Sequence, residues 1–482
     1  KKMERILNYI NGELVEPNSK SYLENFEPAT GKVYGEIPDS DHTDIDQAIT
    51  AAEAAKDVWA KTSRQDRSDY LTKMANVIET KMDQFVAAES RDNGKPEKLA
   101  RAVDIPRAVS NLKFFATAIL HTESQFHRMD DLAINYTDRK PIGVVGCISP
   151  WNLPLYLFTW KIAPALATGN CVIAKPSEVT PMTAYLLSKA AIEAGLPKGV
   201  LNIIHGLGAK VGASITEATG IKAISFTGGT STGKAIASVA APMFKKMSLE
   251  LGGKNPNIIF EDCDFDKALS TTVMSSFANQ GQICLCGSRI MVQRSIYEKF
   301  RDAFVEKVSK LQVGDPKNED SNLGAIVSKE HLEKIKYYIN LAKEEGGKIL
   351  TGGESPVVDG RCENGYFMRP TIIEGLSYDC RTNQEEIFGP VVTIMPFDAA
   401  EDALIYANST VYGLASTVWT KSLGTAQLMA DKIDSGIVWI NCWLVRDLRT
   451  PFGGMKASGV GREGGNEALR FFTEPKNVCI KL

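Results

Sequence analysis

Residues 142–226 alternate short apolar runs with helical patterns, and this alternation constrains the fold of the 482-residue chain more than any other feature. Apolar runs joined by crossover helices predict a parallel sheet of the α/β class. The runs that define this Rossmann-like sheet are 142–148, 171–175, 200–204 and 223–226, with helices expected near 160–167 and 181–194. The alternation resumes after Gly252-Gly253, which predicts a second α/β domain.

The segments on either side of the first alternating region have different patterns. Residues 44–122 read as helices, with apolar residues spaced by three and four within 45–59, 71–89 and 105–120. Residues 123–142 alternate in a way that predicts a hairpin or an arm, and the tail 471–482 reads as a terminal strand. In the second domain we expect strands at 257–260, 288–292 and 391–395 and helices at 266–279, 296–312, 329–345 and 423–433.

Composition narrows the class of protein. A chain of 482 residues with 44% hydrophobic and 23% charged residues predicts a globular protein of two or three domains. The net charge of -3 gives no reason to expect a nucleic acid or an anionic membrane as partner. Nine scattered cysteines, five histidines and the lack of a long apolar run predict a reduced cytoplasmic protein without a zinc site.

Three residues have the chemistry of a covalent catalyst. Cys284 lies in a polar, glycine-bearing turn where a thiol can be a nucleophile, and Glu250 precedes a Gly-Gly turn. A thiol and a carboxylate can divide the formation and hydrolysis of a covalent intermediate. Asn152, at a strand end, could donate to an oxyanion. Taken singly, each has an ordinary alternative, namely a buried core thiol for Cys284 and a helix cap for Glu250 and Asn152.

Two strand ends have features of a dinucleotide site. The segment 226–233, Phe-Thr-Gly-Gly-Thr-Ser-Thr-Gly, stands between a strand and a helix, where backbone N–H groups can approach a phosphate. Glu178, in Lys-Pro-Ser-Glu, follows another strand, where a carboxylate can bind a ribose diol and repel a 2′-phosphate. These features favour NAD over NADP. The alternatives are an ordinary strand-to-helix turn and a solvated helix-cap glutamate.

Seven motifs occur in a fixed order and together resemble the aldehyde dehydrogenase superfamily over essentially the whole chain. They are SPWNLP (149–154), KPSE (175–178), FTGGTSTG (226–233), LELGGKNP (249–256), GQICLCGSR (281–289), EEIFGP (385–390) and PFGGMKASGVGREGG (451–465). The resemblance implies that Cys284 is the nucleophile and Glu250 the general base. It also implies an oxyanion hole made by Asn152 and the Cys284 N–H.

The same resemblance implies an NAD cofactor, no metal, and three structural parts together with a return segment. It implies an NAD-binding domain at 1–122 and 143–251, a catalytic domain at 252–443, an oligomerisation arm at 123–142 and 467–482, and a return segment at 444–466 that borders the substrate mouth. The arm implies self-association as a dimer or tetramer. The residues implied to bind NAD are Ile148, Ser149, Pro150, Trp151, Lys175, Ser177, Glu178, Gly208, Phe226, Thr227, Gly228, Gly229, Thr230, Gly233, Leu251, Glu386 and Phe388.

Arginines near the implied substrate mouth suggest which aldehyde is oxidised. Arg446 and Arg449 precede the PFGG motif, and Arg107 lies on a helix that the family places beside the same tunnel. The guanidinium fork matches a carboxylate, so we expect Arg107 and Arg446 to bind the far acid group of a semialdehyde. Surface or subunit-interface salt bridges are the alternative for these arginines.

The segments IPRAV, SPWNLPLYL, ANQGQICLCGSRI and NCWLVR resemble the branch of the family that oxidises muconic semialdehydes in the breakdown of tryptophan and of catechols. We expect 2-aminomuconate 6-semialdehyde as the substrate, with 2-hydroxymuconic semialdehyde as an alternative. An apolar aldehyde such as retinal is a further alternative, because Tyr156 and Trp160 could line an apolar tunnel. Two alternatives are not aldehyde dehydrogenases. One is a binding protein without turnover, and the other is a thioesterase-like hydrolase that needs no cofactor.

Overall fold

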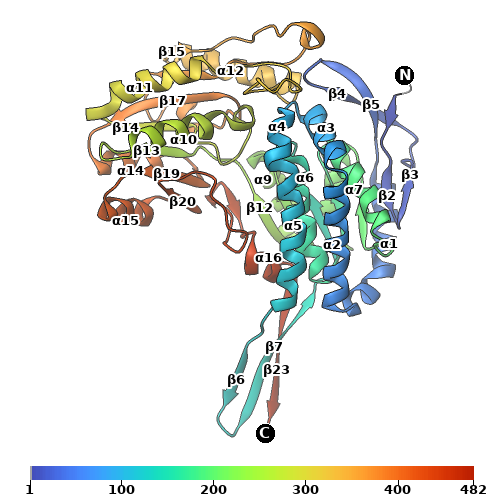
Figure 1. Cartoon of the computed structure of the whole chain (residues 1–482). Helices are drawn as coiled ribbons and strands as arrows, with labels where there is room; N and C mark the ends of the chain where they lie inside the picture. Colours follow the sequence, from blue (N-terminus) through green and yellow to red (C-terminus); the bar gives the residue numbers. More distant parts are fainter. Residues whose placement is uncertain (1–2) are drawn as a thin grey trace.

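A computed structural model describes residues 3–482, and its ribbon has two α/β bodies and a projecting arm (Figure 1). The core of the first body is an eight-stranded sheet. Its five parallel strands follow the order β10-β9-β8-β11-β12, and their bounds are Leu201–Ile203, Cys171–Lys175, Val144–Ile148, Ala223–Thr227 and Lys246–Glu250. The chain runs outward from β8 in both directions, which is a doubly wound order. The parallel sheet expected from the alternation is confirmed.

Antiparallel strands close both edges of this sheet. β22 (Gly459–Val460) pairs with β12 at one edge, and β2 (Asn8–Ile10) and β3 (Glu13–Val15) extend the other. The helices of this body are α1 (His42–Lys61), α2 (Arg64–Thr80), α3 (Met82–Asn93), α4 (Glu97–Leu99), α5 (Ile105–Ala118), α6 (Pro154–Ala167), α7 (Met182–Glu193), α8 (Ala213–Glu217), α9 (Thr230–Ala240) and α16 (Gly465–Phe471).

Two helix predictions differ from the structure. The pattern over 71–89 predicts one helix, but the chain forms α2 and α3 with a break at Lys81. The helix expected from about residue 160 begins at Pro154, because proline is well suited to the first turn of a helix. Between α4 and α5, residues Ala100–Asp104 form a π-helical turn.

The second body contains a seven-stranded sheet with the order β15-β16-β17-β14-β13-β19-β20, in which β15 alone is antiparallel among the described strands. The strand bounds are Lys348–Thr351, Thr371–Glu374, Val391–Phe397, Arg289–Gln293, Pro256–Ile259, Ala415–Trp419 and Ile437–Ile440. Its helices are α10 (Phe265–Phe277), α11 (Arg294–Ser309), α12 (Lys329–Glu344), α13 (Arg381–Gln384), α14 (Ala400–Asn408) and α15 (Leu423–Lys432). The strands and helices expected in this region are therefore confirmed.

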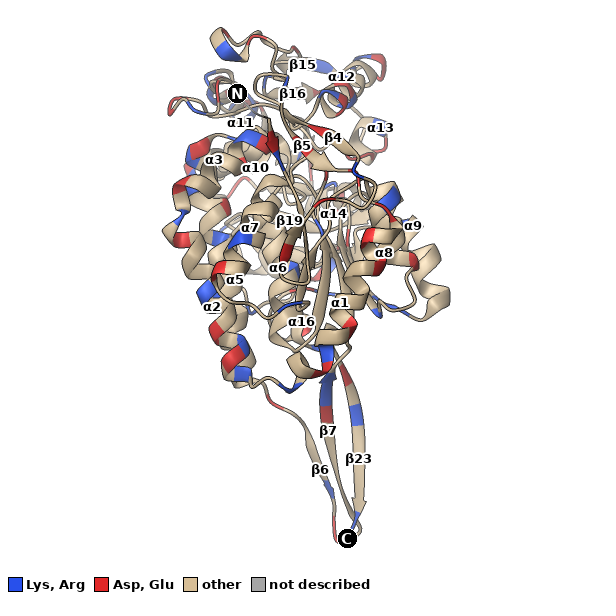
Figure 2. Ribbon diagram, turned by 90° about the vertical axis from the view of Figure 1, so that its right-hand side faces the viewer, with Lys and Arg blue, Asp and Glu red and all other residues tan. Residues whose placement is uncertain are grey.

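The arm is a three-stranded antiparallel sheet that projects from the first body (Figure 2). β6 (Phe126–Met129) pairs with β7 (Ala133–Pro141), and β23 (Thr473–Lys481) pairs with the other edge of β7. The predicted arm boundary at residue 467 falls within α16, whose Ala468 and Leu469 lie in the hydrophobic core of the first body. The projecting strand therefore starts at Thr473.

Two small sheets complete the fold. One contains β1 (Glu4–Arg5), β5 (Lys32–Pro38) and β4 (Tyr22–Glu27), and the other contains β18 (Tyr412–Gly413) and β21 (Met455–Lys456). None of the helices within residues 3–482 combines the length and apolarity needed to cross a membrane.

Candidate active site

The predicted catalytic and dinucleotide residues meet at the carboxyl ends of the first sheet. Asn152 follows β8, Glu250 ends β12, and Thr227 begins the glycine turn after β11. β8 and β11 are neighbours in the sheet, although the chain leaves β8 toward β9. Ligands of doubly wound sheets bind at such a switch point. The fold therefore brings together residues that are separated by up to a hundred positions in the sequence.

Cys284 lines a pocket of about 320 Å³ and is partly exposed in it. Glu386 and Phe388 line the same pocket, together with Gly253 and Lys254. The nucleophile predicted from the sequence is thus next to the two residues predicted to hold the nicotinamide end of the cofactor. Within residues 3–482 no cluster of His, Cys, Asp and Glu has an arrangement suited to a metal ion.

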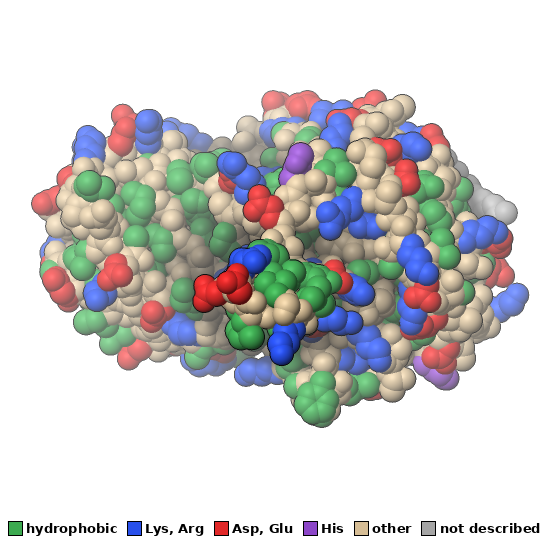
Figure 3. Space-filling view, turned by 90° about the horizontal axis from the view of Figure 1, so that it is seen from below, with side chains coloured by type: hydrophobic (Ala, Val, Ile, Leu, Met, Phe, Trp, Pro, Cys, Tyr) green, Lys and Arg blue, Asp and Glu red, His purple; other side chains and the backbone are tan. Residues whose placement is uncertain are grey.

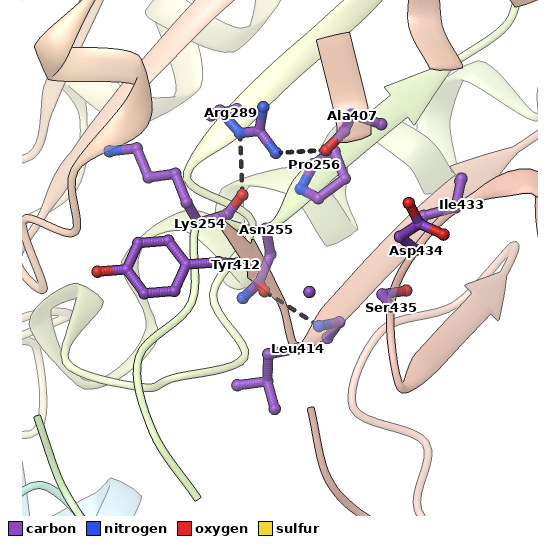
Figure 4. Close-up of a pocket in the computed structure, with 12 residues that line it drawn as sticks. Lys254, Asn255, Pro256, Arg289, Ala407, Tyr412, Leu414, Ile433, Asp434 and Ser435 are labelled. Atoms are coloured by element: carbon purple, nitrogen blue, oxygen red, sulfur yellow. Dashed lines mark hydrogen bonds between the residues drawn. The ribbon is translucent and has the colours of Figure 1, made fainter. Parts of the chain in front are cut away.

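Asn255 fixes the loop that carries Cys284. Its Nδ2 donates to the carbonyl oxygens of Cys284 and Cys286 at 2.6 and 2.8 Å, and its Oδ1 accepts from the N–H of Ala415 at 3.1 Å. Figure 4 shows the Asn255 side chain with its bond to the N–H of Ala415, and the bond from Arg289 Nε to the Lys254 carbonyl, which is 2.9 Å long. These bonds determine the loop backbone, so the thiol is held in one place.

The side chain of Asn152 is buried and reaches the same loop. Its Nδ2 donates to the carbonyl oxygen of Gln282 at 3.1 Å. This contact ties the predicted oxyanion donor to the segment that precedes the nucleophile. A donor amide that is tied to the loop of the nucleophile has the chemistry to stabilise a charge on a substrate oxygen near that loop.

Glu250 has a buried carboxylate whose two oxygens find no partner within residues 3–482. Burial, together with the nearby carboxylate of Glu463, raises the pKa of Glu250 well above its ordinary value. A side chain at Gly453 would not fit here, because a Cβ at that position would lie 2.8 Å from Glu250 Oε1. The chain can therefore pass this close to the carboxylate only because residue 453 is a glycine.

The Cys284 thiol is strongly disfavoured as a thiolate. Burial raises its pKa, and the carboxylates of Glu250 and Glu386 raise it further. Since the thiolate is the reactive form, a base must remove the thiol proton before or during attack. The carboxyl group of Glu250 has a raised pKa, which is the property expected of a group that exchanges protons near neutral pH.

The predicted dinucleotide cleft contains polar atoms that await a ligand. Ser149 Oγ and Thr227 Oγ1 are buried and lack a partner within residues 3–482. A Cβ at Gly229, the N-cap of α9, would meet nothing within 4 Å, so the helix N-terminus is open to a phosphate. These observations fit a dinucleotide in this cleft.

Lys175 ends β9, the strand beside β8, and Glu178 follows three residues later. Lys175 Nζ lies 3.2 Å from Glu178 Oε2, and the N–H of Gly208 donates to Glu178 Oε1 at 3.4 Å. Although burial opposes it, the Lys175 charge holds the pKa of Glu178 below its ordinary value. The carboxylate is therefore ionised at neutral pH and can accept hydrogen bonds from a ribose diol.

Most other residues predicted to bind the cofactor lie along the same sheet edge. Ile148 ends β8, Ser177 follows β9, and Gly233 in α9 packs so closely on Leu251 that a Cβ would lie 2.4 Å from Leu251 Cδ2. The remaining positions in this group are Pro150, Phe226, Gly228 and Thr230.

Glu386 and Phe388 come from the second body and are held firmly. Glu386 Oε1 accepts from the N–H of Gly253 at 2.9 Å. Phe388 has a φ of 60° and packs edge-on against Trp151, with ring centroids 5.3 Å apart. Its carbonyl oxygen bonds to His331 Nε2 at 2.6 Å. The left-handed backbone at Phe388 is strained for an aromatic residue, and such strain is common at ligand sites.

Two arginines lie over aromatic rings at the far end of the site. The Arg446 guanidinium carbon is 4.3 Å from the Phe452 ring centroid and 5.7 Å from that of Trp160. The guanidinium of Arg107 lies 5.3 Å from the ring centroid of Tyr156. Tyr156 and Trp160 are four residues apart on α6, so the two guanidinium groups lie over neighbouring rings of one helix. Burial lowers the pKa of Arg446, and the charge of Arg107 lowers it further. Both residues predicted to bind substrate are therefore in one place.

Each of these arginines has a nitrogen without a partner. Arg107 Nη1 and Arg446 Nη2 are buried and make no hydrogen bond to any residue of the range 3–482. Arg449 differs, because its guanidinium pairs with Asp447 at 2.6 Å and 80% of its side chain is exposed. Two neighbouring buried cations with free donors can be satisfied by a carboxylate, since its two oxygens match the guanidinium fork.

Comparisons with known proteins identify the family to which this arrangement belongs. The model of the "Aldehyde dehydrogenase family" matches residues 14–478. The chain is an aldehyde dehydrogenase. It is 49% identical to the 2-aminomuconic semialdehyde dehydrogenase of Danio rerio over 98% of both chains. It is 44% identical to the 2-hydroxymuconic semialdehyde dehydrogenase of Pseudomonas sp. (strain CF600) over 100% of both.

Solved structures agree with this assignment. The fold of this aldehyde dehydrogenase matches that of an aldehyde dehydrogenase from Bacillus cereus with a TM-score of 0.97 and 38% identity, covering 99% of this chain and 97% of the other. That structure is described as an NAD+ complex. The family and the α/β fold expected from the motifs are confirmed.

Several polar residues of this aldehyde dehydrogenase site were not found by sequence reasoning. Lys161 Nζ donates to Glu463 Oε1 at 2.8 Å, close to Glu250, and Lys95 Nζ donates to the carbonyl of Asn152 at 3.3 Å. His331 holds the Phe388 carbonyl. Lysine in a helix or loop usually lies on the surface, so its sequence position carries no signal of burial.

Proposed function

We propose that the protein uses NAD to oxidise an aldehyde that carries a carboxylate at its far end. The observation that carries this proposal is the pair Arg107 and Arg446, two neighbouring guanidinium groups that each have a buried nitrogen without a partner. The favoured substrate is 2-aminomuconate 6-semialdehyde. This choice is supported by the names of the relatives at 48–49% identity and by the positive mouth.

In the proposed mechanism the Cys284 sulfur attacks the aldehyde carbon and forms a thiohemiacetal. The amide of Asn152 and the N–H of Cys284 stabilise the oxyanion as the charge develops. Asn152 suits this role because its amide is held against the nucleophile loop by Gln282. When bound, NAD supplies the acceptor for the hydride that leaves the former aldehyde carbon. Cys284 then holds the acyl group as a thioester.

Glu250 is the proposed general base for hydrolysis. Its oxygens, which have no partner within residues 3–482, can accept the proton of a water molecule. Attack of that water on the thioester releases the acid and returns the thiol. The raised pKa of Glu250 makes the carboxylate a stronger base than an exposed glutamate.

We infer that the cofactor is NAD rather than NADP. The ionised carboxylate of Glu178, held between Lys175 and the N–H of Gly208, would bind the two hydroxyls of the adenosine ribose and repel a 2′-phosphate. The buried free hydroxyls of Ser149 and Thr227 and the open N-terminus of α9 would hold the pyrophosphate region.

The pair Arg107 and Arg446 makes 2-hydroxymuconic semialdehyde a second candidate substrate, because this aldehyde has the same far carboxylate. A relative that is 44% identical has that name. Retinal lacks a carboxylate, so it would leave both guanidinium groups unsatisfied, which is energetically unfavourable in a buried site.

The test is steady-state NADH formation with both muconic semialdehydes, retinal and hexanal, comparing wild type with Arg446→Met. We expect kcat/KM for the acidic aldehydes to fall about 10- to 100-fold, as for a lost charge-assisted hydrogen bond. Rates with hexanal should change little. Arg449→Ala is the matched control, because Arg449 is exposed and paired with Asp447. Equal activity of Arg446→Met and wild type with the acidic aldehydes would contradict the proposal that Arg446 binds the substrate carboxylate.

We also infer self-association as a dimer or tetramer through the arm. Seen end-on, apolar side chains gather on the arm (Figure 3). They include Phe126 and Leu132, with exposed fractions of 58% and 57%, and Leu482 at 57%. Exposed apolar residues grouped on a projecting sheet are typical of protein interfaces. Light scattering on a size-exclusion column should give a mass of two or four chains, and a monomer would contradict this inference.

A further inference from the structure

A buried ion pair lies directly behind the proposed oxyanion donor and has no role in the chemistry described above. Lys95 Nζ pairs with Asp104 Oδ1, and the two side chains are 0% and 1% exposed. Lys95 follows Gly94, the left-handed residue that ends α3, and Asp104 ends the π-helical turn before α5. Burying an ammonium group is costly unless nearby groups pair with its charge and accept its hydrogen bonds. The groups that it contacts therefore indicate what the lysine does in the structure.

The second partner of Lys95 is the backbone carbonyl of Asn152. Lys95 Nζ donates to this oxygen at 3.3 Å, Asn93 Nδ2 at 3.3 Å and Asn279 Nδ2 at 3.0 Å. Three donors fix the peptide plane that follows Asn152 and therefore the direction in which its side chain leaves the backbone. At the other end, the Asn152 amide bonds to Gln282. Both ends of the residue are held.

We propose that Lys95 and Asp104 are positioning residues for Asn152, with the ammonium holding the Asn152 carbonyl and the carboxylate holding the ammonium. This inference rests on the proposed role of Asn152 as oxyanion donor. Neither Lys95 nor Asp104 touches the substrate in this proposal. They act by keeping the Asn152 amide where the oxyanion forms, because a donor displaced by about 1 Å can lose about 100-fold in rate.

The charges around the pair support this role. Glu89 of α3 is the other buried acid in the cluster, and its oxygens accept from the N–H of Leu155 at 3.4 Å. Burial raises the pKa of Glu89 to about 8, although the Lys95 charge opposes the shift. The direct partner of the Lys95 ammonium in this cluster is the carboxylate of Asp104.

The same pair also connects the two ends of the substrate site. Asp104 directly precedes α5, and Arg107 lies one turn further along this helix. The Lys95–Asp104 contact thus joins the loop of Asn152 to the helix of Arg107. The same buried ion pair therefore supports the proposed oxyanion donor, Asn152, and the helix of Arg107, which is proposed to bind the substrate carboxylate.

The experiment compares Asn152→Ala, the double variant Lys95→Met/Asp104→Leu and the triple combination, all as full-length enzyme. The double variant replaces the ion pair with apolar side chains, which often preserves folding where a single change leaves a buried charge. We expect its kcat for NADH formation to fall about 10- to 100-fold. The NAD dissociation constant and the rate at which iodoacetamide labels Cys284 should stay within about two-fold of wild type. Lys95→Arg keeps a cation beside Asp104, so this variant should retain more of the wild-type kcat than the double variant does.

The triple variant separates positioning from general structural damage. If the pair acts through Asn152, the triple variant should be no slower than Asn152→Ala, because effects on one unit are not additive. Additive losses, or wild-type kcat in the double variant beside an impaired Asn152→Ala, would overturn the inference while leaving the proposed function intact. Wild-type activity of Asn152→Ala itself would instead overturn the oxyanion assignment on which the inference rests.

Discussion

The reacting end of the site and its mouth differ in how their polar groups are satisfied. At the reacting end, the carbonyl of Asn152 accepts three hydrogen bonds, and Asn255 holds two carbonyls of the Cys284 loop. At the mouth, Arg107 and Arg446 lie on aromatic rings and keep buried nitrogens without partners within residues 3–482. The polar groups at the proposed reacting end are therefore satisfied within the protein, whereas those at the proposed mouth are left for the substrate that we propose.

The difference has a physical reason. Groups that stabilise a transition state must already be oriented before the charge appears, so their own hydrogen bonds are made within the protein. Groups that select a substrate gain most when the substrate removes an unsatisfied buried charge. Glu250 is the exception at the reacting end, since its two oxygens lack partners within residues 3–482 and await a water molecule. Substitutions at the two ends should therefore have different kinetic signatures.

The largest effect is expected from Cys284→Ala. Without the nucleophile, we expect kcat to fall by about 10⁴-fold or more with every aldehyde, acidic or not. Cys286→Ala is the control, because this buried thiol only approaches the Ala278 carbonyl at 4.0 Å and should leave most activity. Initial rates and the mass of an acyl-enzyme trapped by acid quench would be measured. Equal losses in both variants would argue against Cys284 as the sole nucleophile.

The next effect is expected at Glu250 and is visible in the pH profile. The raised pKa of Glu250 and of the Cys284 thiol means that their reactive, deprotonated forms accumulate as pH rises. Activity should therefore increase with pH through neutrality and fall as pH drops. Glu250→Gln should lower kcat about 10²- to 10⁴-fold, the range for a lost general base, and remove one ionisation from the profile. An unchanged profile in that variant would assign the ionisation to another group.

A third, smaller effect tests whether Arg107 and Arg446 bind the same carboxylate. We expect Arg107→Met and Arg446→Met each to reduce kcat/KM for an acidic aldehyde about 10- to 100-fold. The double variant should lose less than the product of the single losses, because both cations are proposed to bind the same carboxylate. Hexanal should be oxidised at near wild-type rate by all three. Multiplicative losses would indicate that the arginines bind separate groups.

The smallest effect is expected from the ring beneath Arg446. Phe452→Leu keeps an apolar side chain but removes the ring surface 4.3 Å from the guanidinium carbon. A cation–π contact is worth about 0.5–2 kcal/mol, so KM for an acidic aldehyde should rise a few-fold while kcat stays near wild type. Phe471→Leu is the matched control, because its ring faces Lys246 away from the site. A similar rise in both variants would point to general loosening.

The sequence predicts the parts of this site that interrupt regular structure. Cys284 and Glu250 could be found because glycine turns adjoin them, and Asn152 because a proline motif ends its strand. The parallel arrangement of the first sheet follows from alternating apolar runs. The break at Lys81 could not be predicted, because no glycine or proline marks it and the apolar spacing continues from α2 into α3. Periodicity reports which face is buried but not where one helix stops.

The supporting contacts were beyond sequence reasoning for a different reason. Lys95 contacts Asn152, and Lys161 contacts Glu463 across most of the chain length, so these pairs exist only after the fold has formed. β12 was also missed, because its Lys-Met-Ser start lacks the apolar character of the other parallel strands. Its place in the sheet is set by pairing with β11 and β22.

The pairing of β22 with β12 also determines when the enzyme can become active during its synthesis. Gly459 lies opposite Glu250, and the segment around it brings Arg446, Gly453 and Glu463 to residues made much earlier. A nascent chain that has emerged only as far as the Cys284 loop has its nucleophile but neither a shaped pocket for the base nor a substrate clamp. The Cys284 thiol is therefore synthesised before the C-terminal residues that complete the proposed site.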